Sequence, residues 1–322
     1  MTLQGRVRAS QALQQAGLDV QRAGPLERAS SITNEVWYAG PWVVRVNARP
    51  RRGNLLHESQ VATLLPPEVG YPEVVAFGED ASAEWLVHRR IPGVVLSVAW
   101  PALSEAERRS ATHQLADRLK LIHGVEGAPV PSYLYDDTLE CPHQLPPERT
   151  IELLRRAADL PSVDRGVMQD AIDVVEANAH FVTGDRSVKM VHGDLHFENV
   201  LWQDGRITAI LDLEWARPES PDLDLDVLLR FCAHPFLHVS EGYEHLARAE
   251  DYRLVPGWLQ DAYPTLFQRP HLAECLVVYG ISYDVRDLLA EPPDRPIERL
   301  SPFHPLRRIA TTVRQKGYFR GL

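Results

Sequence analysis

The sequence predicts an α+β protein with a small, β-rich first lobe and a larger, mainly helical second lobe. Runs of β-branched and aromatic residues with strand character gather before Gly93. Apolar residues at helical spacing dominate the chain after that point. The length of 322 residues is sufficient for two lobes that each bury a core. These three observations favour strands and helices gathered in separate regions of one fold.

In the first lobe, helical and strand patterns follow one another in short segments. Alanine and leucine residues at helical spacing precede Gly17, which favours the end of a helix. Val36 to Tyr38 and Trp42 to Val46 flank a turn of small residues and have the composition of strands. The expected elements are a helix before residue 17, strands at 36–38 and 42–46, a helix at 55–65, and strands at 71–77 and 85–87.

The second lobe shows helix patterns with clear boundaries. Ser104 and Glu107 form a Ser-x-x-Glu capping box, which predicts the start of a helix. Leu115, Leu119 and Ile122 would make the buried stripe of that helix. Further helices are expected at 151–160, 163–181, 272–289 and 305–318.

The most informative stretch is His192-Gly193-Asp194-Leu195-His196-Phe197-Glu198-Asn199, which stands between two strand-like runs. Asp204-Gly205 follows as a two-residue hairpin turn signal. The hairpin would place Asn199 at its entry beside Asp212 at its exit, with Asp194 on the preceding loop. One amide and two carboxylates that converge on a point can hold Mg²⁺ through oxygen and leave a carboxylate to orient a hydroxyl.

Two other interpretations of this stretch stay open at the residue level. The acids could be incidental members of a surface loop and hairpin. His192 and His196 are four residues apart, which is the spacing of two zinc ligands on one helix face. Gly193 and the flanking strands argue against a helix there. We therefore expect His192 to bond the backbone of the loop.

The pattern His-Gly-Asp-Leu-His-x-x-Asn, followed by Asp-x-Glu-x-Ala at 212–216, resembles the catalytic and metal loops of the aminoglycoside phosphotransferase and choline kinase family. Protein kinases, which share this fold, have His-Arg-Asp and Asp-Phe-Gly at the two places. The resemblance extends roughly from Ser30 to Leu289 and implies a two-lobed protein-kinase-like fold. It implies a nucleotide-binding N-lobe at 1–93 and a C-lobe at 94–322, which holds the catalytic loop, the metal loop and acceptor-binding helices.

The resemblance further implies a small-molecule kinase that transfers the γ-phosphoryl group of ATP, or of GTP, to a hydroxyl group. Asp194 would orient and deprotonate that hydroxyl. Asn199 and Asp212 would hold Mg²⁺ at the phosphates, and positioning together with charge stabilisation would supply most of the acceleration. Backbone contacts to a purine leave little trace in side chains, so the sequence does not distinguish ATP from GTP.

In this family a loop and strands of the N-lobe fold over the nucleotide phosphates, and here that loop includes Thr33 and Asn34. Residues 30–35 contain no glycine, whereas many relatives carry one or more. Arg45 stands where the family has its phosphate-binding cation, and an arginine offers a planar fork to phosphate oxygens. A solvated strand arginine is the alternative.

Glu58 and residues 88–93 complete the nucleotide site that the resemblance implies. Glu58 resembles the helix glutamate that pairs with the strand cation and would fix Arg45 toward phosphate. An exposed helix acid is the alternative. Residues 88–93 resemble the hinge between the lobes, where the backbone at Arg89 and Ile91 would meet the edge of the purine.

The composition is that of a globular protein with an acidic balance. Lys and Arg number 34 and Asp and Glu 44, and the resulting net charge of −10 disfavours a nucleic-acid partner. The first residues lack the apolar core of a signal peptide, and no apolar run is long enough to span a membrane. Cys141, Cys232 and Cys275 are widely separated and fit reduced thiols, so we expect a cytoplasmic protein.

Most of the negative charge lies between Glu214 and Glu298, a segment with sixteen acids and seven Arg and Lys. An acidic cleft would concentrate a small cationic or polyhydroxylated acceptor that is rich in amines, such as an aminoglycoside. A metabolic kinase for choline, a sugar or homoserine has the same motifs and stays open, as does a non-catalytic nucleotide-binding regulator. Aromatic residues suited to a quaternary-ammonium cage occur here, although most should be core. They are Trp215, Tyr243, Tyr252, Trp258, Tyr279 and Tyr283.

Three aspartates follow the metal-loop pattern at alternate positions. Asp224 falls on the position that in the family ties the metal loop to the next helix, so we expect a structural role for it. Asp222 and Asp226 are expected to be solvated.

Overall fold

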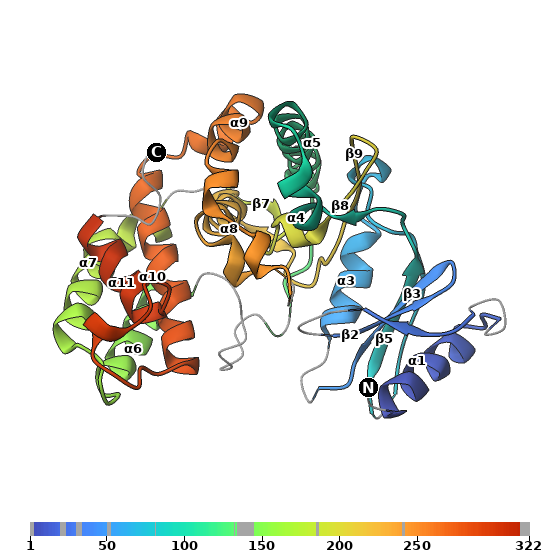
Figure 1. The fold of residues 1–322 in the computed structure, drawn as a ribbon, viewed down its shortest axis with the longest axis horizontal. Helices are drawn as coiled ribbons and strands as arrows, with labels where there is room; N and C mark the ends of the chain where they lie inside the picture. The colour runs from blue at the N-terminus through green and yellow to red at the C-terminus, as the bar shows by residue number, and fades with distance from the viewer. Residues whose placement is uncertain are drawn as a thin grey trace.

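The computed structural model describes residues 3–19, 24–29, 34–49, 53–80, 82–131, 133, 145–184, 187–239 and 242–315. Figure 1 shows the sheet with α1 and α3 on one side of the molecule and α6, α7, α10 and α11 grouped on the other. Helices α5, α8 and α9 lie between these two groups. The predicted α+β arrangement, with strands gathered in the first lobe and helices in the second, is therefore confirmed.

The first lobe is a five-stranded antiparallel sheet with the strand order β1-β2-β3-β5-β4. Its strands are β1 (Glu27–Arg28), β2 (Glu35–Ala39), β3 (Trp42–Asn47), β4 (Val74–Glu79) and β5 (Glu84–Arg89). Helix α1 (Leu3–Gln15) contributes to a core with one face of this sheet. Helix α3 (Asn54–Ala62) packs against β4 and β5.

Alternation along the strands decides which side chains face the site. Trp37, Val44 and Trp85 belong to the core with α1. Because neighbouring residues of a strand point to opposite faces, Val43 and Arg45 turn to the other side of the sheet. Both of them line the cavity described below.

The chain leaves the sheet at β5 and enters the second lobe through residues 90–93. Strand β6 (Val94–Val95) pairs with β8 (Val200–Gln203), which forms a hairpin with β9 (Arg206–Ile210). The two residues after Gly93 therefore already belong to a sheet of the second lobe. For this reason we propose that the lobes meet at Gly93.

The remaining elements are mainly helical. The helices are α4 (Leu96–Ala99), α5 (Glu105–His123), α6 (Pro147–Ala158), α7 (Arg165–Thr183), α8 (Asp222–Ala233), α9 (Val255–Ala262), α10 (Leu272–Ala290) and α11 (Pro305–Gln315). The short 3₁₀ helices are η1 (Pro67–Val69), η2 (Trp100–Ala102), η3 (Phe197–Asn199), η4 (Pro235–Leu237), η5 (Glu244–Leu246), η6 (Ala249–Tyr252), η7 (Pro264–Phe267) and η8 (Ile297–Arg299). Strand β7 (Lys189–Val191) pairs with β10 (Arg217–Glu219). Ser104 and Glu107 form the predicted capping box at the start of α5.

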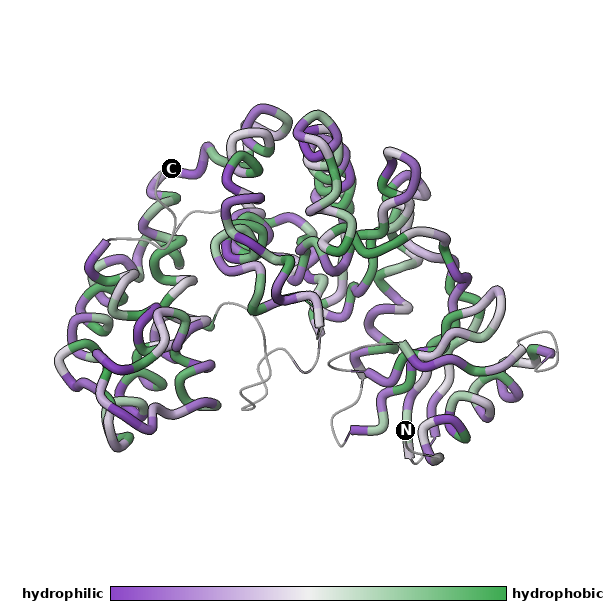
Figure 2. Tube along the Cα trace, in the orientation of Figure 1, coloured by the Kyte–Doolittle hydropathy of each residue, from purple (hydrophilic) through white to green (hydrophobic). Residues whose placement is uncertain are grey.

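The core of the second lobe is large and continuous, and it joins the hairpin to α5, α7, α8 and α10. In Figure 2 hydrophobic and hydrophilic residues alternate along α5, α6 and α11, as expected for helices with one buried face. Cys232 and Cys275 are free thiols buried in this core, and Cys141 lies outside the described residues. Within the described ranges, no helix has the length and apolar character that a membrane crossing requires.

Some predicted boundaries were wrong by a few residues. The strand expected at 71–77 begins at Val74, because Pro72 has no N–H group to offer a sheet ladder. The helix expected at 55–65 ends at Ala62, ahead of the Pro66-Pro67 pair. A strand was expected before His192 and is β7, whereas the short strands β1, β6 and β10 were not predicted, because two or three residues carry no readable alternation.

Candidate active site

A cavity of about 710 Å³ lies between the first-lobe sheet and the hairpin of the second lobe. Eight of the nine residues that the sequence predicted for the site line it: Asn34, Arg45, Glu58, Arg89, Ile91, Asp194, Asn199 and Asp212. The ninth, Thr33, falls outside the described residues. Residues 160 positions apart in the chain are thus brought to one place by the fold.

The hairpin forms as its sequence indicates. Asp204 and Gly205 have φ angles of 48° and 80°, which is the left-handed geometry of a type I′ turn. Strands β8 and β9 then pair along their length. At the open end, the Leu211 N–H donates to the carbonyl oxygen of Asn199 at 2.8 Å. Asn199 and Asp212 are therefore held at the same mouth of the hairpin.

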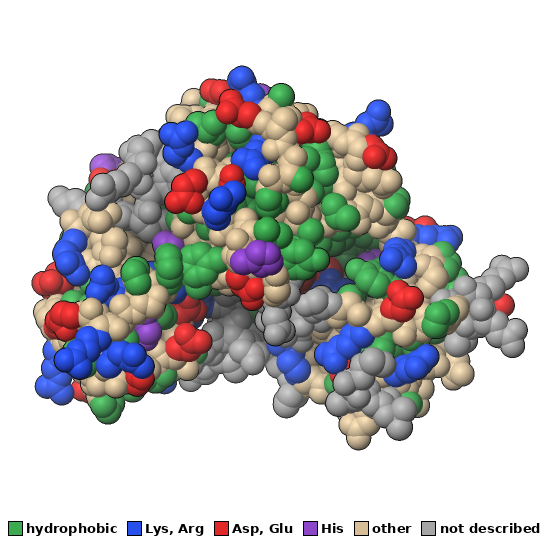
Figure 3. Space-filling model, viewed as in Figure 1, with side chains coloured by type: hydrophobic (Ala, Val, Ile, Leu, Met, Phe, Trp, Pro, Cys, Tyr) green, Lys and Arg blue, Asp and Glu red, His purple; other side chains and the backbone are tan. Residues whose placement is uncertain are grey.

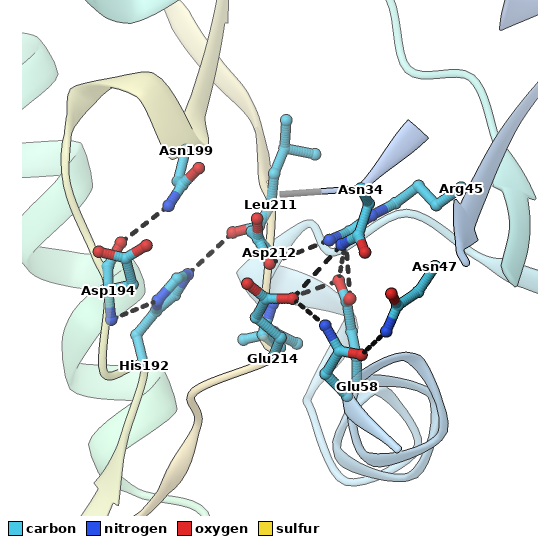
Figure 4. A network of polar contacts seen from close by, with 12 residues as sticks. Asn34, Arg45, Asn47, Glu58, His192, Asp194, Asn199, Leu211, Asp212 and Glu214 are labelled. Atoms are coloured by element: carbon cyan, nitrogen blue, oxygen red, sulfur yellow. Dashed lines mark hydrogen bonds and ion pairs between the residues drawn. The ribbon is translucent and has the colours of Figure 1, made fainter. Parts of the chain in front are cut away.

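His192 supports the backbone of the catalytic loop, as predicted. Its Nε2 atom lies 2.9 Å from the carbonyl oxygen of Leu211, and its Nδ1 atom accepts from the Asp194 N–H at 3.3 Å. Because both ring nitrogens are engaged with the backbone, His192 is not available to pair with His196 as a zinc ligand. The bonds also fix the loop that carries Asp194 to the strand that leads to Asp212 (Figure 4).

Asp224 anchors the same loop from α8. Its carboxylate accepts from the backbone N–H groups of His192 at 2.9 Å and Gly193 at 2.8 Å, and His123 Nε2 lies 3.1 Å from it. The structural role expected for Asp224 is confirmed, but the described bonds go to the catalytic loop and not to the metal loop. Gly193 has φ 81°, and a Cβ there would lie 2.3 Å from the Trp215 carbonyl oxygen. Only glycine fits this approach.

Asp194 lies at the bottom of the cavity. His196 Nε2 is 3.4 Å from Asp194 Oδ1, and the Asn199 amide nitrogen donates to the Asp194 carbonyl oxygen at 2.8 Å. Burial raises the pKa of the Asp194 carboxyl to about 6, although the nearby imidazole of His196 lowers it. The carboxylate is therefore a stronger base than an exposed aspartate and is still ionised at neutral pH.

Arg45 is held between two acids. Its Nη1 atom donates to both oxygens of Glu58, at 2.5 and 2.7 Å, and its Nη2 atom lies 3.1 Å from Asp212 Oδ1. Arg45 is 7 % exposed and Glu58 0 %, so the alternatives of a solvated arginine and an exposed helix acid were wrong. Tyr71 and the Leu213 N–H complete the shell of Glu58, with donor distances of 2.7 and 3.2 Å.

The opposite charges of Arg45 and Asp212 stabilise each other. Burial alone would lower the pKa of Arg45 and raise that of Asp212. The attraction between them, with Glu58 also acting on Arg45, outweighs burial and holds the pKa of Arg45 well above its usual value and that of Asp212 below it. Asp212 has φ 64°, a backbone conformation that such residues adopt where the surroundings enforce it.

Glu214 is a member of the site that sequence reasoning missed. Its Oε2 atom accepts from the side-chain amides of Asn34 at 3.3 Å and Asn54 at 2.6 Å (Figure 4). Burial, with the negative charge of Asp212, raises the pKa of Glu214 to about 8. Tyr133 donates to the Glu214 carbonyl oxygen. The available signal was the acid two residues after Asp212, on the same side of the metal loop.

The acidic segment between Glu214 and Glu298 does not line this cavity as a whole. Among its described acids, only Glu214 is a lining residue. Asp222 and Asp226, which were expected to be solvated, are 2 % and 3 % exposed. Asp222 pairs with Arg269, which lets α8 keep that carboxylate inside the core. Figure 3 shows acidic and basic side chains interspersed over the visible face.

The aromatic residues of that segment do not form a cage either. Trp215 and Tyr283 line the cavity, whereas Tyr252 and Tyr279 are buried in the core. The Tyr283 ring already has the guanidinium of Arg230 at 4.2 Å from its centre.

The fold is that of a two-lobed, kinase-like protein. A model of the phosphotransferase enzyme family matches residues 26–258, and the chain belongs to that family. No curated protein matches the chain.

Solved structures of aminoglycoside phosphotransferases share the fold. A thermostable mutant of APH(4)-Ia, in a ternary complex with ADP and hygromycin B, has a TM-score of 0.63 and 17 % identity, covering 98 % of this chain and 99 % of its own. Aminoglycoside 2′-phosphotransferase-IIIa in its GDP complex has a TM-score of 0.63 and 16 % identity, and the match covers 97 % of this chain and 98 % of that chain. The streptomycin-ATP-APH(2″)-IIa ternary complex has a TM-score of 0.58 and 17 % identity, and the match covers 89 % of this chain and 91 % of that chain. The predicted two-lobed protein-kinase-like fold is confirmed.

Proposed function

We propose that this protein transfers the γ-phosphoryl group of a nucleoside triphosphate to a hydroxyl group of a small cationic or polyhydroxylated acceptor. The proposal rests above all on one observation, which is that Asp194, Asn199 and Asp212 surround one cavity that also contains Arg45. Family membership agrees with it. The ligands named for the similar structures, which are nucleotides and aminoglycosides, make aminoglycosides the first acceptors to test.

In the mechanism that follows, Asp194 acts on the acceptor. Its buried carboxylate accepts the hydrogen bond of the attacking hydroxyl, orients the oxygen toward the phosphorus and takes the proton as the new P–O bond forms. The bond from the γ-phosphorus to the bridging oxygen breaks in the same step, and the nucleoside diphosphate leaves. Arg45 presents its guanidinium to the phosphates, while Glu58 fixes its direction. The chain thus contributes mainly orientation and fixed charge.

The donor set at the hairpin mouth fits Mg²⁺. Asp212 offers a carboxylate. The side-chain amide nitrogen of Asn199 donates to the loop, and this bond leaves the amide oxygen of Asn199 as the other ligand. Two protein oxygens are what Mg²⁺ commonly uses when phosphates supply the rest of its shell. Bound there, Mg²⁺ would neutralise the charge of the phosphates. The free buried thiols and the need for a nucleoside triphosphate support a cytoplasmic location.

A metabolic kinase for a sugar, choline or homoserine is the second candidate. The part of the cavity near Asp194 is lined by His196, Leu237, His238 and Tyr283. Burial lowers the pKa of His238 well below its usual value, so its ring is neutral. A wall of rings with few carboxylates favours a polyhydroxylated acceptor over a strongly charged polyamine. If an antibiotic of the aminoglycoside type is the acceptor, phosphorylation would contribute to antibiotic resistance.

The test is a transfer assay over a panel of aminoglycosides, amino alcohols and sugars with product detection, combined with calorimetry of nucleotide binding. Asp194→Asn should lower transfer about 10²- to 10⁴-fold and leave nucleotide affinity almost unchanged, because Asp194 acts on the acceptor. The matched variant Asp212→Asn keeps Asp194 and should lose Mg²⁺-dependent nucleotide binding. Near-normal turnover of Asp194→Asn would refute the mechanism. Nucleotide binding without transfer to any acceptor would favour a regulator.

A further inference from the structure

The side chain of His88, on β5 of the first-lobe sheet, faces the cavity. On β5, Trp85 and Val87 belong to the core with α1, so alternation turns His88 to the opposite face. His88 is opposite Val43 in the register of β3 and β5, two residues along each strand from the pair of Arg45 and Leu86. It lies immediately before Arg89, where the hinge begins, and it lines the cavity.

His88 lies at the end of the cavity that suits the base of a nucleotide, and not at the end that suits its phosphates. Arg45, Asp212 and Glu58 mark the phosphate end of the cavity by their charge. The apolar side chains of Val36 and Val43, with Ile91 of the hinge, mark the end that suits a flat ring. His88 is 7 % exposed and brings a buried hydrogen-bonding ring beside these apolar side chains.

The tautomer of His88 is set by its neighbour. Its Nδ1 atom lies 3.2 Å from the carbonyl oxygen of Arg89. A carbonyl oxygen only accepts, so Nδ1 carries the proton and the Nε2 atom of the neutral ring has a lone pair. Nε2 makes no hydrogen bond to any residue in the described part of the chain, and it is not sealed off from the cavity.

The ring stays neutral under ordinary conditions. Burial, followed by the positive charge of Arg45, lowers the pKa of His88 to about 4. The Nε2 atom is therefore an acceptor and not a donor at neutral pH.

We infer that His88 selects the purine of the nucleotide, in favour of a 6-amino base over a 6-oxo base. The Nε2 lone pair accepts a hydrogen bond from the 6-amino group of adenine. A guanine or hypoxanthine would present its 6-oxo oxygen to the same lone pair, and two acceptors face to face leave both without a donor. This inference rests on the proposed function, since it names the nucleotide of that site.

The size of the preference follows from the cost of an unsatisfied polar group. A buried acceptor without its donor costs about 1–3 kcal/mol. Because about 1.4 kcal/mol corresponds to a factor of ten, the protein should prefer the 6-amino nucleotide by about 5- to 150-fold.

The experiment compares ADP with IDP by titration calorimetry on the full chain, because IDP carries the 6-oxo group without the 2-amino group of GDP. Wild type should bind ADP at least about fivefold more tightly than IDP. His88→Leu should weaken ADP binding and lower the ratio of the two affinities clearly below its wild-type value, since the N1 position, an acceptor in ADP and a donor in IDP, contributes equally in both proteins. His88→Gln should also lower the ratio, but with retained affinity for IDP, because its amide can donate to the 6-oxo oxygen.

His113→Leu makes the same change on α5, away from the residues that line the cavity, and should leave the ratio at its wild-type value. Thermal melting of each variant verifies that the chain is folded. Equal affinities in wild type, or an unchanged ratio in His88→Leu, would overturn the inference and leave phosphoryl transfer untouched. Absence of binding for every nucleotide would instead refute the proposed function, and this inference with it.

Discussion

At the scale of single residues, Asp194 and Asp212 show how position separates two identical side chains. Asp212 is next to the guanidinium of Arg45, which outweighs the effect of burial and keeps its pKa low. Burial dominates at Asp194 and raises its pKa to about 6, although the imidazole of His196 lies nearby. One carboxylate is thereby suited to hold a cation and the other to accept a proton.

This difference predicts the pH dependence of the reaction. The free-enzyme form with ionised Asp194 is the active one, so kcat/KM should rise about tenfold per pH unit below the pKa of about 6 and level off above it. Initial rates measured by product detection across this range test the expectation. In Asp194→Asn the residual activity should lose the rising limb. A kcat/KM that is flat through this region, or that falls as pH increases, would show that another group limits the reaction.

At the scale of elements, the hairpin and α8 together position the catalytic loop. The turn at Asp204-Gly205 sets the register that brings Asn199 to Asp212. Asp224, in the first turn of α8, accepts hydrogen bonds from the backbone N–H groups of His192 and Gly193. The loop therefore has its geometry from an element that comes thirty residues later in the chain.

Replacement of Asp224 by alanine should affect both stability and catalysis. The variant leaves two buried N–H groups without an acceptor, which should lower the free energy of unfolding by about 2–4 kcal/mol. The released loop misplaces Asp194, so kcat should fall at least about tenfold. Denaturant unfolding and initial rates measure the two effects.

The control for this variant is Ser104→Ala at the start of α5. It removes a helix cap far from the site, and it should cost about 1 kcal/mol of stability with unchanged kcat. If Asp224→Ala loses stability but keeps a normal kcat, the loop does not depend on α8 for its active geometry.

At the scale of the whole molecule, the metal loop forms hydrogen bonds with side chains of the first lobe. Glu214 accepts hydrogen bonds from Asn34, which directly precedes β2, and from Asn54, the first residue of α3. Asp212 meets Arg45 of β3, and the carbonyl oxygen of Ala216 lies 2.6 Å from His57 Nε2. A change in the distance between the lobes would therefore alter the contacts of Asp212, the proposed metal ligand.

Glu214→Gln tests the role of this junction. Because the pKa of Glu214 is raised to about 8, its side chain is mostly protonated at pH 7 and resembles an amide. Glutamine keeps an oxygen for both asparagines, so stability should change by less than about 0.5 kcal/mol. Mg²⁺-dependent nucleotide affinity, measured by calorimetry, should also be nearly unchanged.

The comparison variant Glu214→Ala removes the acceptor of both asparagines. It should cost about 1–3 kcal/mol of stability and weaken nucleotide binding. A large loss of Mg²⁺-dependent binding in Glu214→Gln, with normal stability, would show that the negative charge of Glu214 holds the metal.

Local chemistry explains what could be predicted without coordinates. A two-residue Asp-Gly turn has few alternatives for its backbone, so the hairpin and the meeting of Asn199 with Asp212 followed from neighbouring residues. The capping box of α5 is equally local. Asp194 was available as a candidate because its motif has fixed spacing, and Arg45 because the family resemblance implies a cation on that strand.

Long-range packing decided the rest. The sequence alone determined the α+β class and the loop that carries Asp194, Asn199 and Asp212. It could not show that Asp222 is buried with Arg269, that Glu214 accepts hydrogen bonds from two asparagines, or that His88 lines the cavity with Nδ1 beside the Arg89 carbonyl oxygen. Charge counted along the chain suggested an acidic cleft, whereas folding placed most of those acids away from the cavity. The burial, partners and pKa of a side chain depend on segments far away in the sequence, and these segments come together only in the tertiary structure.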